Sequence, residues 1–160
     1  MVKLLLAGTG LIGHRHMQHI LEHPELELVG VIDPLITDEK IEGVKTYHSL
    51  NDVNNVAEGI ILATPTDTHA DLTIQALEMG MHVLVEKPVA ASLLEADKMI
   101  SASEKTGLSI LVGHHRRHHP LVNETINILK SGKIGRPVAA SLMWLMRKQD
   151  EYFDVDWRKG

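Results

Sequence analysis

Three glycines near the N-terminus, Gly8, Gly10 and Gly13, form a G-x-G-x-x-G pattern between a short apolar run and a stretch of helical periodicity. In that setting the first glycine permits a tight turn, the second lets the backbone approach a pyrophosphate, and the third allows close packing of helix and strand. The free N–H groups at the start of the helix, which includes Leu11 and Ile12, favour the phosphate charge. The pattern predicts a diphosphate site, although a tight turn that binds nothing would have the same glycines.

Asp33 strengthens this prediction, because it stands twenty positions beyond Gly13 at the end of the next apolar run. A carboxylate there can accept hydrogen bonds from both hydroxyls of an adenosine ribose, and it repels a 2′-phosphate. The next three residues, Pro34 to Ile36, include no arginine or lysine that would reverse this preference. We therefore predict NAD rather than NADP. Two alternatives stay open: a solvated turn carboxylate, and a methyltransferase that holds its adenosyl cofactor with a similar loop and acid.

A group of polar residues follows a later apolar run, at the kind of strand end where open α/β sheets bind ligands. For the side chains of Asp67 and Thr68 we predict capping of the next helix, with a place at the ligand site as the alternative. The candidate cofactor-binding residues of this group are Thr64, Pro65, Thr66 and His69.

Glu86, Lys87 and Pro88 follow the apolar run at 82–85. The proline restricts Lys87 to extended geometry, which aims the lysine side chain out of the strand end. An ammonium group beside a nicotinamide can hydrogen-bond a substrate hydroxyl and, when partly desolvated, exchange its proton. Lys87 is thus the candidate catalytic residue, and the alternative is a surface ion pair between Lys87 and Glu86.

Elements that could position these residues alternate along most of the chain. Short apolar runs cover residues 3–7, 27–32, 59–63, 82–85 and 108–112, with a weaker run at 44–47 that would add an edge strand. Helical periodicity covers residues 11–21, 68–79 and 92–105, and the last two stretches end at Gly80 and Gly107. This alternation predicts a parallel sheet covered on both faces and wound by right-handed crossovers into an α/β, doubly wound Rossmann fold.

The pattern changes after Pro120. A helix is predicted over residues 121–130, and residues 138–146 form a longer β-like run that is apolar on both alternating faces. Such a strand expects cover on both sides. We therefore predict a dinucleotide-binding domain over 1–120 and, over 121–160, the start of an incomplete second α/β domain. An extra edge strand on the first sheet is the alternative.

Composition excludes several classes of protein. The 160 residues include no cysteine, which excludes disulfide frameworks, thiolate metal sites and cysteine nucleophiles. The net charge of -5 gives no basic surface for nucleic acid, and the apolar opening is too short for a signal peptide or membrane span. We therefore expect a soluble, cytoplasmic protein with neither nucleic-acid nor membrane partners.

Histidines at 114, 115, 118 and 119 have the i,i+4 spacing of helical zinc ligands. Gly113 and Pro120 argue against a continuous helix, and no carboxylate lies within the cluster. We therefore predict no metal site, and we assign His115 and Arg116 to the polar lining of a substrate crevice.

Together these motifs resemble those of the glucose–fructose oxidoreductase, inositol dehydrogenase and MocA family. The resemblance rests on residues 8–13, 63–69 and 82–88, and it continues through 113–120 and 132–137 to Trp157 and Arg158. It implies a dinucleotide-binding domain followed by an α/β domain whose large open sheet lines the substrate site and builds oligomers. Members of that family oxidise a hydroxyl of a sugar, inositol or similar polyol, or catalyse the reverse reduction.

The resemblance also implies roles for single residues. It puts Lys87 at the reacting hydroxyl, adds Glu86 to the cofactor site and Trp157 and Arg158 to the substrate site, and puts the family's aspartate-and-histidine motif beyond Gly160. We therefore predict the cofactor-binding, N-terminal part of an NAD-dependent dehydrogenase of polyols or sugars, inactive alone and assembled into homo-oligomers through its C-terminal region. The alternative is a non-catalytic NAD-binding regulatory or scaffolding module.

Overall fold

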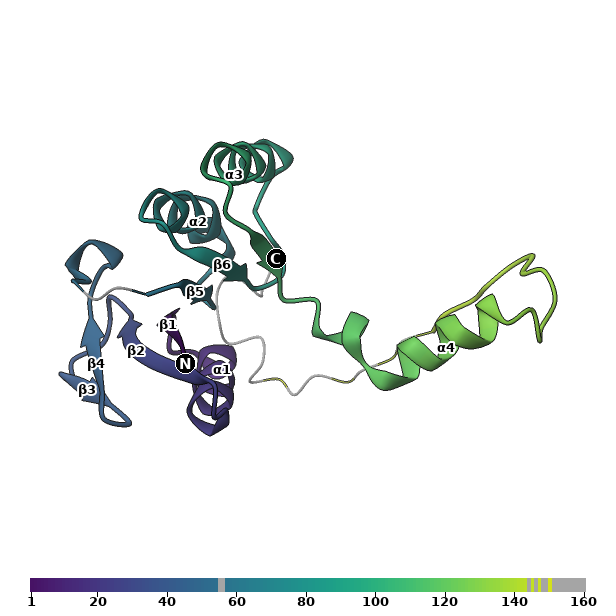
Figure 1. Cartoon of the computed structure of the whole chain (residues 1–160), viewed down its shortest axis with the longest axis horizontal. Coiled ribbons are helices and arrows are strands. Elements are labelled where there is room, and N and C mark those ends of the chain that lie inside the picture. The colour runs from purple at the N-terminus through teal and green to yellow at the C-terminus, as the bar shows by residue number, and fades with distance from the viewer. Residues whose placement is uncertain (55–56, 144, 146, 148–149, 151–160) are drawn as a thin grey trace. The chain divides into compact units, whose positions relative to one another are not determined.

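A parallel sheet occupies the first of two units into which the chain divides, Met1–His115 and Arg116–Gly160. The computed structural model describes residues 1–54, 57–143, 145, 147 and 150 (Figure 1). Among these residues the sheet has seven strands in the order β3-β4-β2-β1-β5-β6-β7. The strands are β1 (Val2–Ala7), β2 (Leu26–Ile32), β3 (Lys40–Ile41), β4 (Val44–Tyr47), β5 (Gly59–Leu62), β6 (His82–Val85) and β7 (Ile110–Val112).

The predicted doubly wound fold is confirmed. The pairs β1–β2, β1–β5, β2–β4, β5–β6 and β6–β7 are parallel, and the β3–β4 pair is antiparallel. Strand order reverses between β1 and β5, because the chain winds outward from β1 to one edge and then outward from β5 to the other. Ligands of open α/β sheets bind at such a reversal, outside the carboxyl ends of the strands.

Helices cover both faces of this sheet, with α1 (Leu11–Glu22) on one side and α2 (His69–Glu78) and α3 (Leu93–Thr106) on the other (Figure 1). Alternate residues of one strand point to opposite faces. In β1, Leu5 belongs to the cluster that includes Leu77 of α2 and Met99 of α3, whereas Leu6 packs with Met17 and Ile20 of α1. The continuous apolar runs of the sequence thus fill two cores.

Helix ends follow local side-chain chemistry in α3. The Ser92 hydroxyl accepts the N–H of Glu95 at 3.2 Å, and Gly107 ends the helix with a positive φ of 71°. The predicted capping of α2 is wrong. Thr68 stands before α2 without accepting a cap hydrogen bond, and its hydroxyl instead donates to the Pro65 carbonyl oxygen at 2.8 Å. A short 3-10 helix, Thr66–Thr68, turns these residues back toward the strand end.

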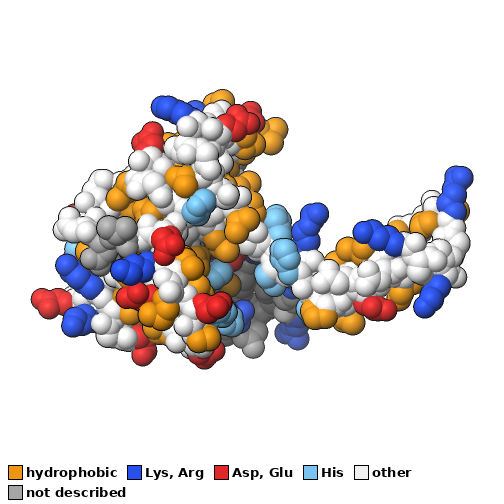
Figure 2. Space-filling view, viewed as in Figure 1, with side chains coloured by type: hydrophobic (Ala, Val, Ile, Leu, Met, Phe, Trp, Pro, Cys, Tyr) orange, Lys and Arg blue, Asp and Glu red, His pale blue; other side chains and the backbone are white. Residues whose placement is uncertain are grey.

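The second unit contains α4 (Pro120–Lys130), which confirms the predicted helix. Its apolar side chains are exposed, as the orange atoms on this segment in Figure 2 show; Leu121 is 70% exposed. The predicted strand over residues 138–146 is wrong for the described part of that run, which contains no strand. A lone strand has no neighbour to pair its N–H and C=O groups, and no described segment supplies one. Residues 144 and 146 lie outside the described residues.

None of the helices that the structure describes is long and apolar enough to cross a bilayer.

Candidate functional site

The three glycines of the first turn have three different environments. Gly8 has a φ of +93°, and a Cβ there would lie 2.5 Å from the carbonyl oxygen of Ala63, at the end of the neighbouring strand β5. A Cβ on Gly13 would lie 2.0 Å from the carbonyl oxygen of Gly8. A Cβ on Gly10 would meet no atom of the described residues within 4 Å. Gly8 and Gly13 are therefore required by packing, whereas Gly10 opens onto free space.

The first turn of α1 begins beside that free space. Gly10 stands at the N-cap position without a capping side chain, and the first intrahelical bond runs from the N–H of His14 to the Gly10 carbonyl at 2.9 Å. The N–H groups of Leu11, Ile12 and Gly13 precede that bond, as the first N–H groups of any helix do. Their backbone donors and the helix dipole make this a site for negative charge.

The carboxylate of Asp33 is held against the glycine turn. One of its oxygens, Oδ2, accepts the N–H of Thr9 at 2.9 Å and the Thr9 hydroxyl at 2.6 Å, and Oδ1 accepts the N–H of Leu35 at 3.0 Å. Partial burial acts to raise the pKa of Asp33, but the hydrogen bonds from the Thr9 hydroxyl, the Leu35 N–H and the Thr9 N–H together lower it below its ordinary value. Asp33 is therefore a carboxylate that stays ionised at neutral pH.

Three of the roughly four acceptor positions of this carboxylate are occupied from within the chain. The remaining position is on Oδ1, which accepts one bond from Leu35. One ribose hydroxyl can use it directly, and a second requires the Thr9 hydroxyl to turn away from Oδ2.

The end of β5 is joined to the end of β6 by a buried histidine. His69 is 1% exposed, its Nε2 lies 3.0 Å from the Thr64 carbonyl oxygen, and its Nδ1 lies 2.9 Å from the Pro88 carbonyl oxygen. Thr64 and Thr66 are partly buried and Pro65 is exposed. The ring of His69 thus joins two strand ends, and its predicted contact with a cofactor stays a prediction.

Lys87 is exposed at the end of β6, next to a Lys87–Pro88 bond that is cis. The alternative ion pair with Glu86 is absent from the described part of the chain. The Glu86 carboxylate instead lies 3.0 Å from Nε2 of His16 on α1, and its other oxygen accepts the backbone N–H of Lys87 at 3.2 Å. Among the described residues, the side chain of Lys87 therefore has no carboxylate partner.

The other predicted residues come from the later part of the sequence. His115 ends the first unit and Arg116 begins the second, and both belong to a short 3-10 helix, His115–His118. Trp157 and Arg158 lie outside the described residues. No group of side chains able to hold a metal ion occurs in the described ranges, and the expectation of no metal stays a prediction.

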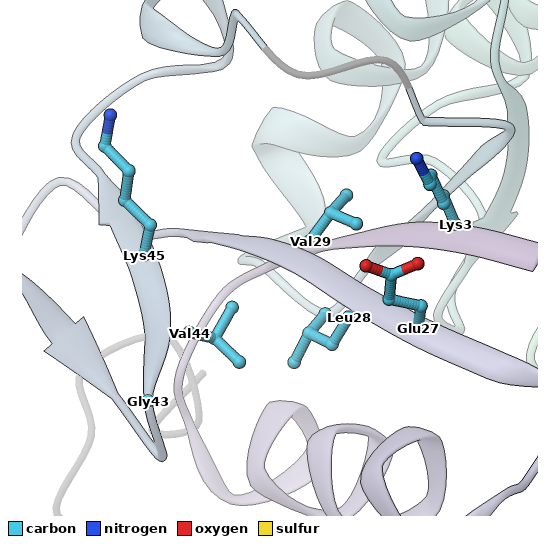
Figure 3. Close-up of a pocket in the computed structure, with 7 residues that line it drawn as sticks. All are labelled: Lys3, Glu27, Leu28, Val29, Gly43, Val44 and Lys45. Carbon is cyan, nitrogen blue, oxygen red and sulfur yellow. The ribbon is translucent and has the colours of Figure 1, made fainter.

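A hollow of about 400 Å³ lies near the amino ends of strands β1, β2 and β4, away from the carboxyl ends that carry the candidate site (Figure 3). It is lined by Lys3 and Glu27 near the starts of β1 and β2, and by residues 43–45 at the start of β4. Ligand-binding groups of this fold stand at the carboxyl ends of strands, so this hollow is not the candidate site.

Two residues of the site were missed in the sequence, Thr9 and His16. Thr9 carried no signal, because its partner Asp33 is 24 positions away and only the pairing of β1 with β2 brings them together. His16 carried a weak signal, because it stands three residues after Gly13 and therefore lies on the same face of the helix as Gly13. The sequence did not show that Glu86 would lie opposite it.

Comparisons with known proteins match this geometry. The sequence profile of the Gfo/Idh/MocA family, described as an oxidoreductase family with an NAD-binding Rossmann fold, matches residues 2–114. Among curated proteins, a scyllo-inositol 2-dehydrogenase (NAD(+)) of Bacillus subtilis is 31% identical over 147 residues, which are 86% of this chain and 42% of that protein. A 4-carboxy-2-hydroxymuconate-6-semialdehyde dehydrogenase of a Sphingobium species is 30% identical over 141 residues, which are 83% of this chain and 44% of that protein.

A solved structure agrees with these relatives. The WlbA dehydrogenase of Bordetella pertussis, in complex with NADH and UDP-GlcNAcA, superposes with a TM-score of 0.77 at 26% identity, covering 84% of this chain and 41% of that one. The chain thus spans less than half the length of the relatives that it matches.

Proposed function

The chain belongs to the Gfo/Idh/MocA family of oxidoreductases, and from that membership we propose that it is the NAD-binding part of a dehydrogenase that acts on a sugar, inositol or related hydroxy compound. The observation that carries the proposal is the joint placement of the glycine turn, Asp33 and Lys87 along the carboxyl edge of β1, β2 and β6. Membership of an oxidoreductase family argues against the methyltransferase alternative.

The residues at this edge fit a dinucleotide. The free space beside Gly10 and the uncapped start of α1 suit a diphosphate, whose oxygens would accept backbone N–H groups. The ionised carboxylate of Asp33 suits a ribose hydroxyl through its remaining acceptor position, and it would repel a 2′-phosphate. These contacts support a preference for NAD(H) over NADP(H).

Lys87 supports the proposed chemistry of the reacting end. A bound nicotinamide supplies or takes up the hydride. The exposed ammonium of Lys87, which has no carboxylate partner in the part of the chain that the structure describes, is able to donate a hydrogen bond to a substrate hydroxyl, to orient it, and to exchange a proton with it. Lys87 is therefore proposed as the catalytic residue of this part of the enzyme, and Thr64–Pro65, joined to the Lys87 segment through His69, as its neighbour on the cofactor side.

The rest of the reaction is proposed to need the part of the relatives that this chain does not span. The match covers less than half of these relatives, so we expect the 160-residue chain to bind NAD(H) without turning over a polyol or sugar. The division into domains at residue 120, assembly through residues 121–160 and a cytoplasmic location stay predictions.

Calorimetric titration tests the proposal. We expect the chain to bind NADH at least about tenfold more tightly than NADPH, which corresponds to about 1.4 kcal/mol of discrimination by the Asp33 charge. In Asp33→Asn, which removes the charge and keeps the shape, we expect that ratio to approach one. Asp97→Asn, an exposed carboxylate change on α3, is the charge-matched control and should keep the wild-type ratio. Equal affinities in the wild-type chain would contradict the proposed role of Asp33, and no binding of either dinucleotide would contradict the proposal itself.

A further inference from the structure

The side chain of Glu86 is held from three directions at the end of β6. Its Oε1 lies 3.0 Å from Nε2 of His16, with 15% of the Glu86 side chain and 23% of the His16 side chain exposed. Its Oε2 accepts the backbone N–H of Lys87 at 3.2 Å. A Cβ on Gly113, just after β7, would lie 2.8 Å from Oε1, so the third neighbour is bare backbone. The carboxylate is therefore fixed beside α1 and folded back on its own strand end.

The Lys87 ammonium is the cation nearest in sequence to this carboxylate, yet the two form no ion pair in the described part of the chain. Adjacent residues of a strand point to opposite sides. If the contact with His16 is lost, the Glu86 side chain can nevertheless turn toward the crevice, because the backbone at the end of β6 is no longer held in the geometry of the strand. A second histidine, His69, reaches this segment from α2, with its Nδ1 2.9 Å from the Pro88 carbonyl oxygen.

We infer that His16 is a positioning residue for Lys87. By holding the Glu86 carboxylate on the α1 side, His16 keeps it from pairing with the ammonium and leaves the Lys87 side chain available to a substrate hydroxyl. The inference rests on the proposed function, because it explains how Lys87 stays available for its proposed catalytic role. His16 itself is not proposed to contact cofactor or substrate.

The same contact ties the phosphate end of the site to its reacting end. His16 lies one turn after Gly13 on the helix whose first N–H groups face the proposed diphosphate site, and Glu86 precedes Lys87 on the strand end. Two glycines leave little space around this contact. A Cβ on Gly13 would lie 2.0 Å from the Gly8 carbonyl oxygen, and a Cβ on Gly113 would lie 2.8 Å from Oε1 of Glu86. Lys87 is thus positioned by the helix that would bind the cofactor.

Competitive acetylation of lysines at constant pH, read by mass spectrometry, measures the effect directly. Only an unprotonated amine reacts, and a carboxylate beside it stabilises the protonated form. In His16→Ala we expect the labelling rate of Lys87 to fall about two- to fivefold relative to wild type, the range of an exposed ion pair. The rate of Lys98, exposed on α3, serves as the internal reference.

Further variants separate positioning from general loosening of the fold. His16→Gln keeps a donor for Glu86 and should restore the wild-type rate, and the double variant His16→Ala with Glu86→Gln should restore it as well, because no carboxylate is left to pair with Lys87. His19→Ala, an exposed histidine of the same helix, is the matched control and should change nothing. Circular dichroism and cooperative urea unfolding establish that each variant folds.

Two results would overturn the inference: an unchanged rate in His16→Ala, or a reduced rate that persists in the double variant. Should His16→Ala fail to fold, the single variant Glu86→Gln decides, because a carboxylate already held by His16 can be removed without changing the rate of Lys87. A rise of twofold or more in Glu86→Gln would contradict the inference. Titration of the wild-type chain with NADH separates the two claims, since failure to bind refutes the proposed function whatever the labelling shows.

Discussion

At the scale of the residue, Asp33 has a structural role in addition to its proposed role in binding the cofactor. The carboxylate is bound to the turn that precedes α1 by two hydrogen bonds from Thr9, so it stabilises that turn in addition to its proposed contact with a ribose. Such preorganisation lowers the cost of ordering the site when a ligand binds. Its consequence is a carboxylate whose ionised form contributes to folding.

Stability should depend on pH through this residue. Because the pKa of Asp33 is lower in the folded chain than in the unfolded chain, its contribution is complete above the unfolded value of about 3.9 and is lost as the pH falls through the folded value. We expect Asp33→Asn to lower the free energy of unfolding at pH 7 by about 1–2 kcal/mol. The deficit relative to wild type should narrow below about pH 4.

Urea unfolding of both chains, from pH 7 down to the lowest pH at which they remain folded, measures this deficit. Asp97→Asn should track the wild-type curve throughout. A deficit of Asp33→Asn that stays constant across the acid range would mean that the Asp33 charge does not stabilise the turn.

At the scale of the element, the glycine turn separates what the fold needs from what a ligand needs. The sequence pattern assigns one role to each glycine, and the environments of the three positions agree with those assignments. Gly8 and Gly13 contact backbone, and substitution there displaces the strand end or the helix. A Cβ on Gly10 would meet no atom of the described residues within 4 Å, so packing does not require a glycine there, and the proposed pyrophosphate supplies the reason for one.

Alanine should therefore mainly lower the stability of the fold at Gly13 and mainly weaken ligand binding at Gly10. We expect Gly13→Ala to cost about 3 kcal/mol or more, because its Cβ would stand 2.0 Å from the Gly8 carbonyl oxygen and neither backbone can yield. Gly10→Ala should cost about 1 kcal/mol, the price of a poorer N-cap, and should weaken NADH binding at least about tenfold. Thermal unfolding and calorimetry measure the two effects. Full NADH affinity in Gly10→Ala would place the diphosphate elsewhere.

Most helices and strands were predictable because glycine or proline residues stand at their ends. Two other features, β3 and the run at 138–146, depended on strand pairing. β3 is a two-residue strand without periodicity, and it forms because Glu42 and Gly43 adopt positive φ values of 50° and 80° in the hairpin turn to β4. As a result β4, predicted at the sheet edge, lies one strand inside it. The apolar run at 138–146 has strand composition but no pairing partner among the described residues, which is why composition alone misled.

At the scale of the molecule, the proposed cofactor site belongs to one unit. Glycine turn, Asp33, His69 and Lys87 all precede His115, and every residue of the two hydrophobic clusters lies between positions 4 and 112. The second unit presents apolar side chains of α4 to solvent, with Leu129 41% exposed. Exposed apolar faces of this kind can bind other protein segments, and assembly through residues 121–160 stays a prediction.

A chain that ends at His115 should therefore fold and bind by itself. Because both cores are complete within residues 4–112, we expect its thermal midpoint to lie within about 5 °C of that of the 160-residue chain, a shift that corresponds to about 1 kcal/mol for a domain of this size. Its affinity for NADH should be unchanged within about twofold, and light scattering should find it monomeric at concentrations where the longer chain, with α4 exposed, associates. Non-cooperative unfolding, or loss of NADH binding, would show that residues after His115 complete the first unit. Association of the two chains to the same extent would instead remove α4 and the residues after it from the predicted assembly surface.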